Sequence, residues 1–415
     1  MRGPARRSLW RETSSPRSWA SLGGTRERHL PDFPLLFAAL ALLLLGLLMV
    51  ASASLPLSLH FYDEPERLFL KQLLAAALGL GVLGALVCWD YRKLQRYDGL
   101  WLVGALGATL LTFIPALAPN GLWLRLGGFS LQPTEFLKVA FIVYMAAALV
   151  RKEQTGDLEH FTTGALPFYA LLGLIALIAI LQPDFALVAL FGAITGFMLF
   201  VAGVRLLYLW GPLLAGLPFI ALLLWLAPYR RERLLSYLNP FADPEGAGYH
   251  LLQSLIALGS GGLWGRGLGA SREKWLYLPS AYNDFIVSVI GEELGLLGVL
   301  LVLGLFGLLC VRGFRIALSA PDRFGFLLAS GLTFALALQA AVNVSVAVGV
   351  LPVTGLTLPL VSYGGSSLIV SLLMVGILLN VSRYAVTERT QGERYEHPRR
   401  GWGNRRPPLP RVGAA

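Results

Sequence analysis

Charged residues are scarce in this sequence: Asp, Glu, Lys and Arg make up 14% of its 415 residues, against 56% hydrophobic residues. A soluble domain has about a quarter charged residues, so this composition excludes an ordinary soluble globule. Apolar runs of about 18 or more residues recur along the chain, and each can cross a hydrocarbon core of roughly 30 Å. Because lipid offers no partners to backbone polar groups, these runs must be helices. The predicted fold class is an all-α polytopic membrane protein.

Cysteine and histidine are also rare. The two cysteines, Cys88 and Cys310, lie at predicted helix ends on the cytoplasmic side, which excludes a disulfide framework. The five histidines are scattered, and no Cys/His spacing resembles a zinc site. The sequence therefore predicts no metal centre built from these residues.

Basic residues set the predicted topology. We expect ten spans, near residues 34–54, 69–89, 98–117, 135–150, 165–181, 185–203, 206–227, 284–311, 324–346 and 360–381. Lys or Arg residues follow the second, fourth, sixth and eighth of these spans, and both tails are rich in arginine. Since Lys and Arg favour the cytoplasmic side, ten spans with both termini cytoplasmic satisfy this bias at every turn.

The tails also explain the net charge of +10, because seven arginines precede Asp32 and eight follow Asn380. This distribution is typical of membrane topology and argues against nucleic-acid binding. Residues 1–31 and 384–415 are predicted to be disordered basic cytoplasmic tails, since they have too few aliphatic residues to bury a core. They flank a ten-helix membrane domain at 32–383, which includes a large extracytoplasmic loop at 228–283.

Polar residues mark candidate sites at the outer ends of the predicted helices. Trp123 suits the aromatic belt of a membrane surface, and Arg125 can pair with a phosphate. The Gln-Pro-Thr-Glu sequence at 132–135 indicates a helix start, where the positive end of the helix dipole favours Glu135. Lys138 then lies inside the span, where an ionisable group has either a partner or a function. A mutual Glu135–Lys138 pair is the structural alternative.

Asp284 opens the eighth predicted span. On a helix, Ser288, Gly291 and Glu292 share its face, whereas Glu293 points to the opposite face. A stripe of Asp, Ser, Gly and Glu is costly against lipid, so we expect it to face the protein interior or a wet cleft.

Two further segments combine polar residues with Pro or Gly. Asp184 follows Pro183 in a tight turn and is expected to cap the next helix. The segment that enters the last span contains Ser362, Tyr363, Gly364, Gly365 and Ser366. Free N–H groups at such a helix start can bind an anion. A helix–helix contact through small residues is the alternative.

Together these segments predict an outward-facing cleft with an isolated carboxylate, several cations including Lys274, and an exposed helix N-terminus. This combination suits a substrate with a phosphate and a hydroxyl group to be deprotonated. The chain has no Walker loop, Rossmann fingerprint or nucleophile elbow. The energy source would therefore lie in the substrate, as in a lipid-linked diphosphate.

Four motifs, in order, resemble the SEDS family (shape, elongation, division and sporulation proteins) from about residue 34 to 383. They are Gln-Pro-Thr-Glu at 132–135, Gln-Pro-Asp at 182–184, the run from Gly267 through Asp284 to Gly295, and Leu-Pro-Val-Thr-Gly through Ser-Tyr-Gly-Gly-Ser-Ser at 351–367. The Tyr-Leu-Pro stretch and the Asn-Pro-Phe-Ala-Asp-Pro segment are more similar to the division branch than to the elongation branch. The loop at 120–131 is shorter than the family pattern and lacks its paired arginines.

The resemblance implies a peptidoglycan glycosyltransferase that polymerises lipid II into β-1,4 glycan strands by inverting transfer. The family's essential aspartate falls on Asp284, which would be the general base on the acceptor GlcNAc 4-hydroxyl as it attacks the donor MurNAc C1. Arg125, Lys138 and Lys274 are expected to stabilise the negative charge of the leaving undecaprenyl diphosphate. The candidate substrate-binding residues are Trp123, Arg125, Glu135, Lys138, Lys274, Ser288, Glu292, Ser362, Tyr363, Gly364, Gly365 and Ser366.

No cofactor is required by the sequence, although a divalent cation, Mg²⁺ or Mn²⁺, can share the diphosphate charge. The resemblance implies a class B penicillin-binding protein as partner, with other proteins of the division or elongation complex, in the plasma membrane at the division septum. Two alternatives stay open. A lipid II translocase should show internal repeats and ionisable groups near mid-bilayer. A non-catalytic scaffold for a transpeptidase would not need Asp284 in a wet cleft.

Overall fold

The computed structural model describes residues 29–126, 129–182, 184–209 and 248–385, with positions 211, 212, 214, 216, 237, 241 and 243–246. Its longer helices are α3 (Phe33–Tyr62), α4 (Arg67–Cys88), α6 (Asp98–Leu110), α7 (Pro133–Thr155), α8 (Leu166–Leu181), α9 (Phe185–Ala202), α12 (Tyr249–Gly261), α13 (Ile286–Leu318), α14 (Arg323–Ala347) and α15 (Gly365–Ser382). Shorter elements are α5 (Arg92–Arg96), η1 (Leu111–Phe113), η2 (Asp157–Glu159), η3 (Phe161–Ala165), and the antiparallel strands β1 (Leu124–Leu126) and β2 (Phe129–Leu131).

Seven of the described helices are long and apolar enough to cross a membrane: α3, α4, α7, η3 with α8, α13, α14 and α15. Shorter apolar helices at Asp98–Phe113 and Ala186–Ala202 match two further predicted spans. The predicted span at 206–227 lies for the most part outside the described residues. The all-α, multi-pass fold class is confirmed.

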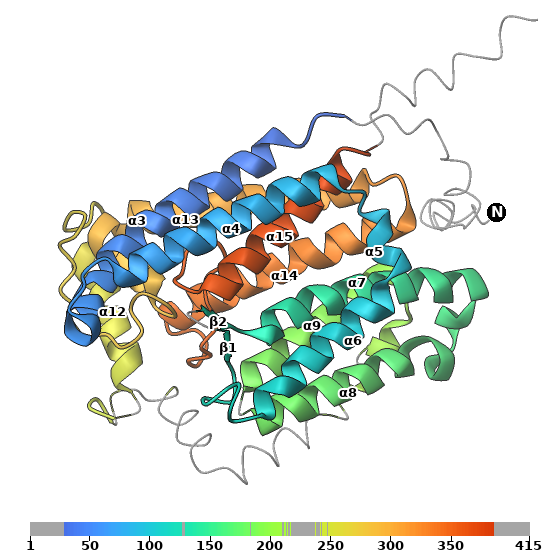
Figure 1. Ribbon diagram of the computed structural model, residues 1–415, viewed down its shortest axis with the longest axis horizontal. Coiled ribbons are helices and arrows are strands. Elements are labelled where there is room, and N and C mark those ends of the chain that lie inside the picture. Colours follow the sequence, from blue (N-terminus) through green and yellow to red (C-terminus); the bar gives the residue numbers. More distant parts are fainter. Residues whose placement is uncertain are drawn as a thin grey trace, which may run out of the picture.

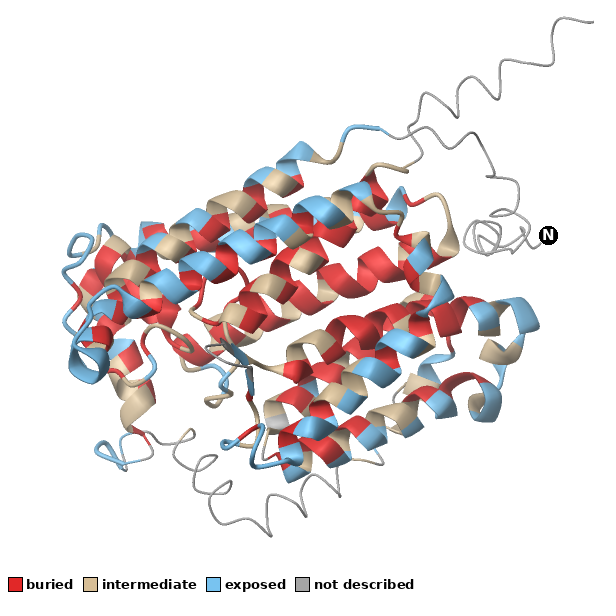
Figure 2. Cartoon of the chain, in the orientation of Figure 1, coloured by how far each residue is buried: buried red, intermediate tan, exposed pale blue. Residues whose placement is uncertain are grey.

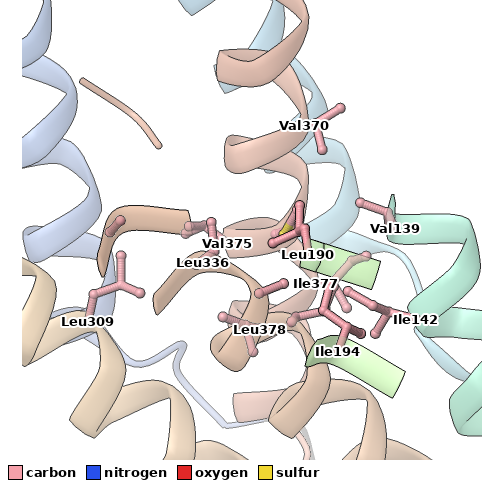
Figure 3. Packing of buried hydrophobic residues seen from close by; sticks show 14 of the residues in the cluster. Val139, Ile142, Leu190, Ile194, Leu309, Leu336, Val370, Val375, Ile377 and Leu378 are labelled. Carbon is pink, nitrogen blue, oxygen red and sulfur yellow. The ribbon is translucent and has the colours of Figure 1, made fainter. Parts of the chain in front are cut away.

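Figure 1 shows two groups of helices side by side, with α3, α4, α13, α14 and α15 in one and α6, α7, α8 and α9 in the other. α15 packs against α4, α14, α3 and α7, so it is the central helix of the larger group. Where the groups meet, Figure 3 shows Ile142 of α7, Ile194 of α9 and Leu378 of α15 close together. Exposed residues follow the outward helix faces, as Figure 2 shows, which are the faces that lipid would cover.

One end of the bundle carries the connecting segments that break the helices. We call it the loop end: it holds α12, the β1–β2 hairpin and residues 262–285 and 348–364, and it lies at the left of Figure 1, opposite α5. Two of these features correct the sequence analysis. The segment expected to be a loop at 120–131 contains the β1–β2 hairpin, and the long loop at 228–283 contains the helix α12.

Several helix boundaries also differ from prediction. α3 continues to Tyr62, beyond the expected end at residue 54, because Pro56 is accommodated inside it and the chain turns only at Asp63, whose φ is +58°. α13 begins at Ile286 rather than at Asp284. α15 begins at Gly365 rather than at residue 360, since the chain before it is irregular.

Candidate active site at the loop end

A break in α13 shapes the loop end. Gly295 has φ +69° and ψ −167°, which interrupts the helix. The loop after α12 pairs with the backbone groups that this break releases: the N–H of Arg266 donates to the carbonyl of Glu292 at 2.9 Å, and that of Leu296 donates to the carbonyl of Gly262, also at 2.9 Å. A Cβ on Gly295 would lie 2.3 Å from the loop backbone. Glycine is therefore needed at this position both for its dihedral angles and for the close approach.

Glu293 and Lys274 form a buried ion pair beside the break. The Lys274 ammonium lies 2.9 Å from Glu293 Oε1, 2.8 Å from Ser52 Oγ of α3 and 2.7 Å from the carbonyl of Gly269. The Lys274 side chain is 4% exposed and that of Glu293 is fully buried. These contacts engage all three donors of the ammonium. Lys274 therefore holds the loop in place. It has no donor left for the predicted contact with a diphosphate.

Glu292 also holds the loop. Its carboxylate accepts from Ser271 Oγ at 2.6 Å and from the N–H of Arg272 at 3.0 Å, and it pairs with Arg266 at 3.2 Å. Ser288, one turn earlier on α13, hydrogen-bonds Ser254 of α12 at 2.6 Å. Glu292 and Ser288 are fully buried. Of the two surroundings that the sequence analysis allowed for this stripe, the structure gives them the protein interior.

Asp284 lies in the turn just before α13 and is partly exposed. Its backbone is fixed on both sides: its N–H donates to the carbonyl of Ser280 at 3.1 Å, and its carbonyl accepts from Asn343 Nδ2 of α14 at 2.9 Å. The Asn343 amide also donates to the carbonyl of Leu356 at 2.7 Å. A Cβ on Gly355 would lie 4.0 Å from Asp284 Oδ2. Asn343 thus holds the Asp284 turn against the segment at 348–364.

The predicted motif at 362–366 packs against the residues that directly precede Asp284. Ser362 Oγ donates to the carbonyl of Asn283 at 2.6 Å, and the N–H of Tyr363 donates to the carbonyl of Tyr282 at 3.0 Å. Gln72 of α4 holds both neighbours of Tyr363. Its Nε2 donates to the Ser362 carbonyl and its Oε1 accepts from the N–H of Gly364, each at 3.1 Å. Ser362 and Gly364 are therefore committed to protein contacts.

Lys138 lies in a second polar network. Its ammonium is 2.8 Å from Glu135 Oε2 and 2.6 Å from Gln339 Oε1 of α14, and the residue is 2% exposed. The Gln339 amide continues to the carbonyl of Thr357 at 3.0 Å, and Thr357 Oγ1 lies 2.8 Å from Ser367 Oγ. The predicted Glu135–Lys138 pair is present. The network includes Thr357, and Asn343 binds the preceding residue, Leu356. The network therefore adjoins the Asp284 turn.

The hairpin brings the remaining predicted residues to the same end. Ser366 Oγ at the start of α15 accepts from the N–H of Gln132, directly after β2, at 2.9 Å. Arg125 on β1 is exposed and has no ion-pair partner among the described residues, and Trp123 just before it is partly exposed. Gly365 is the first residue of α15. Arg125 thus keeps its charge available to an anion.

Asp184 is the helix cap that its sequence context predicts. Its side chain accepts from the N–H of Leu187 at 3.2 Å, at the start of α9. Burial raises the pKa of this carboxyl, and the negative charge of Glu135 raises it further. Asp184 therefore lies close to the Lys138 network, where it serves as a cap.

The structure brings Asp284, Ser362, Tyr363, Gly364 and the Lys138 network together, whereas Lys274, Ser288 and Glu292 belong to the packing of the loop. Sequence reasoning missed three amides that organise the site, Gln72, Gln339 and Asn343. Each is at most 2% exposed and lies in a helix long and apolar enough to cross a membrane. A buried amide in such a helix needs partners, and this is the signal that could have identified them.

Among the described residues, no group of three or more His, Cys, Asp or Glu side chains is placed to hold a metal ion. Three of the carboxylates at the loop end have separate cationic partners: Glu135 pairs with Lys138, Glu292 with Arg266 and Glu293 with Lys274. The donor set therefore does not fit a protein-held Mg²⁺ or Mn²⁺ site.

The fold and this site define a polytopic membrane protein that presents a fixed aspartate, a buried Lys138–Glu135 network and an exposed arginine at one end of its helix bundle. Residues 33–387 match the model of a family described as cell cycle proteins, FtsW/RodA/SpoVE. The chain belongs to this family.

Curated relatives and solved structures agree. The chain is 42% identical over 355 residues to a probable peptidoglycan glycosyltransferase FtsW of Geobacter metallireducens, covering 85% of this chain and 94% of the relative. It is 40% identical over 365 residues to the stage V sporulation protein E of Bacillus subtilis, covering 87% and 99%.

Among solved structures, a chain of a peptidoglycan synthase complex that coordinates polymerization and crosslinking matches with a TM-score of 0.67 at 32% identity, covering 85% of this chain and 98% of that chain. The rod shape determining protein RodA of Thermus thermophilus matches with a TM-score of 0.60 at 30% identity, covering 86% and 98%.

Proposed function

We propose that the protein is a peptidoglycan glycosyltransferase that polymerises lipid II, with Asp284 as its general base. The observation that carries this proposal is the contrast between the carboxylates of the loop end. Glu292 and Glu293 are buried among loop partners. Asp284 is partly exposed and has its backbone fixed on both sides. A general base must combine access to the substrate with a fixed position.

In the reaction, Asp284 takes the proton from the 4-hydroxyl of the acceptor GlcNAc. The oxygen attacks C1 of the donor MurNAc from the face opposite the leaving group, which gives inversion and a β-1,4 bond. The bond from C1 to the diphosphate oxygen breaks, and undecaprenyl diphosphate leaves with the electron pair. Arg125 and the Lys138 network are the groups that we assign to the growing negative charge, because cations near a leaving group stabilise the transition state.

The loop end would face the outside of the plasma membrane, with both termini in the cytoplasm. This orientation places the basic loops in the cytoplasm. It also places the site outside the membrane, where glycan strands are made. We assign the protein to the division septum and to a complex with a class B penicillin-binding protein, which would crosslink the strands. A Mg²⁺ or Mn²⁺ ion bound by the diphosphate itself would offset part of its negative charge.

The test is polymerisation of labelled lipid II by the purified protein, with and without the penicillin-binding protein. Asp284→Asn should lower the rate by about 10²–10⁴-fold, the usual contribution of a positioned base. Asp63→Asn is the matched control, since Asp63 is an exposed carboxylate at the same end and Asn tolerates its positive φ. If the Asp284 variant polymerises at the parent rate, the assignment of the base is wrong. If the parent is inactive even with its partner, a translocase or a scaffold is favoured.

A further inference from the structure

A group of aromatic and cationic residues lies close to Asp284, around the end of α3 and the start of α4. We call it the tyrosine–cation cluster, and it consists of Tyr62, Arg67, Lys71, Tyr282 and Tyr363. Tyr282, two residues before Asp284, contacts Tyr363 edge-on, with ring centroids 5.4 Å apart. Their backbones are also joined, because the N–H of Tyr363 donates to the carbonyl of Tyr282. Two rings are therefore held at a fixed place beside the proposed base.

The cations of the cluster come from the start of α4. The Arg67 guanidinium lies 4.6 Å from the centroid of the Tyr62 ring, and the Lys71 ammonium lies 5.7 Å from it. Lys71 directly precedes Gln72, which binds the backbone on both sides of Tyr363. The end of α3 and the start of α4 therefore lie next to the Tyr282–Tyr363 pair. Burial raises the pKa of the Tyr282 hydroxyl, and the charges of Asp284 and Tyr62 add to this rise, which agrees with their proximity.

These cations differ from the buried lysines of the loop end. Arg67 and Lys71 are exposed. Arg67 pairs with Glu64 at 3.7 Å, with side chains 43% and 66% exposed, and such a pair contributes little. Lys71 has no ion pair among the described residues. Among the described residues, the structure thus leaves Lys71 without an ion pair and Arg67 in a weak, exposed one, both beside the ring of Tyr62.

We propose that the tyrosine–cation cluster binds the disaccharide head of the lipid-linked substrate, an inference that rests on the proposed function. The C–H faces of a sugar pack on aromatic rings, while its hydroxyls hydrogen-bond polar groups such as tyrosine hydroxyls. The two cations take an anionic substituent of that sugar, which is either the diphosphate or a carboxylate of the stem peptide. The cluster places this sugar against Asp284 from the α3–α4 side.

The test uses the full chain in the lipid II polymerisation assay, at low and at high salt. Arg67→Glu and Lys71→Glu should each raise KM about fivefold with little change in kcat, and the effect should shrink at high salt because exposed charges are screened. Tyr62→Ala should raise KM, whereas Tyr62→Phe should keep most of the binding. Lys93→Glu is the matched control, since Lys93 is an exposed lysine 5.9 Å from the Trp89 ring at the other end of the bundle.

A second substrate identifies the anionic group. If lipid II without its stem peptide abolishes the effect of Lys71→Glu, the cation binds a peptide carboxylate, and if the effect persists, it binds the diphosphate. Parent-like kinetics of the Arg67 and Lys71 variants with both substrates would overturn the cluster while leaving the polymerase intact. An inactive parent chain would overturn both proposals.

Discussion

Neutralising Glu293 should release the loop that precedes Asp284. Glu293 is fully buried, and the Lys274 side chain that it pairs with is 4% exposed. Removing one partner of a buried pair costs about 3–5 kcal/mol, because it leaves an uncompensated charge. In Glu293→Gln the amide oxygen still accepts from the N–H of Gly269, which donates to Glu293 in the parent, so we expect a cost of about 3 kcal/mol, the lower end of this range. That cost corresponds to roughly a hundredfold increase in loop opening.

Hydrogen exchange of the amides between residues 266 and 278 measures this opening. Glu292→Gln is the matched control, because it removes the same charge from a neighbouring buried carboxylate whose partner, Arg266, has a side chain 35% exposed. Water can solvate that guanidinium, so the control should speed exchange only about fivefold. Unchanged protection in Glu293→Gln, or equal effects of the two variants, would refute the assignment of Lys274 and Glu293 as the buried clamp of the loop.

Two further predictions concern the helices around the site. Asn343→Ala should lower kcat at least tenfold with little change in KM, because it frees the Asp284 turn without touching the sugar. In an Asp284→Asn background the same change should have almost no further effect, and an additive loss would argue for general misfolding. Asp184→Asn should raise the melting temperature at pH 7, because it keeps the N-cap and removes a partly buried charge near Glu135. The raised pKa of Asp184 means that its stabilising contribution is complete below pH 3.8 and is lost as pH rises through the folded-state pKa. The parent should therefore gain stability on acidification through this group, and identical pH profiles of parent and variant would contradict the shift.

The helices of this fold can be predicted from sequence because lipid allows few alternatives for an apolar run. Helix ends are less constrained. Nothing in the composition of residues 55–62 stops α3, and only the left-handed turn at Asp63 ends it. The break at Gly295 was equally hidden, since Gly in an apolar span is common. Whether the helix breaks at Gly295 depends on a loop about thirty residues earlier in the chain. That loop supplies the hydrogen bonds that the interrupted helix lacks.

The titratable residues of the candidate site could be predicted from the sequence. Which of them hold the loop and which lie beside Asp284 could not. Helical spacing placed Glu292 with Asp284, yet the helix begins only at Ile286, so the two residues do not share one regular face. Spacing also cannot show that Lys274 finds its partner in Glu293, because that contact joins a loop to a helix. The amides of α14 are uncharged, so they stand out less in the sequence than a buried lysine does, although the same cost of burial applies to them.

Those amides explain how the proposed base and the Lys138 network keep a fixed separation. Gln339 and Asn343 are one turn apart on α14, so they project from the same face of the helix. They bind Thr357 and Leu356, which are adjacent residues whose Cα atoms lie about 3.8 Å apart. One helix face and one peptide unit therefore set the spacing between the Asp284 turn and Lys138, independently of the loop clamped by Glu293. It follows that Asn343→Ala should reduce kcat more than Glu293→Gln does, although the Glu293 variant opens the loop more. The reverse order would mean that the loop, and not α14, positions Asp284.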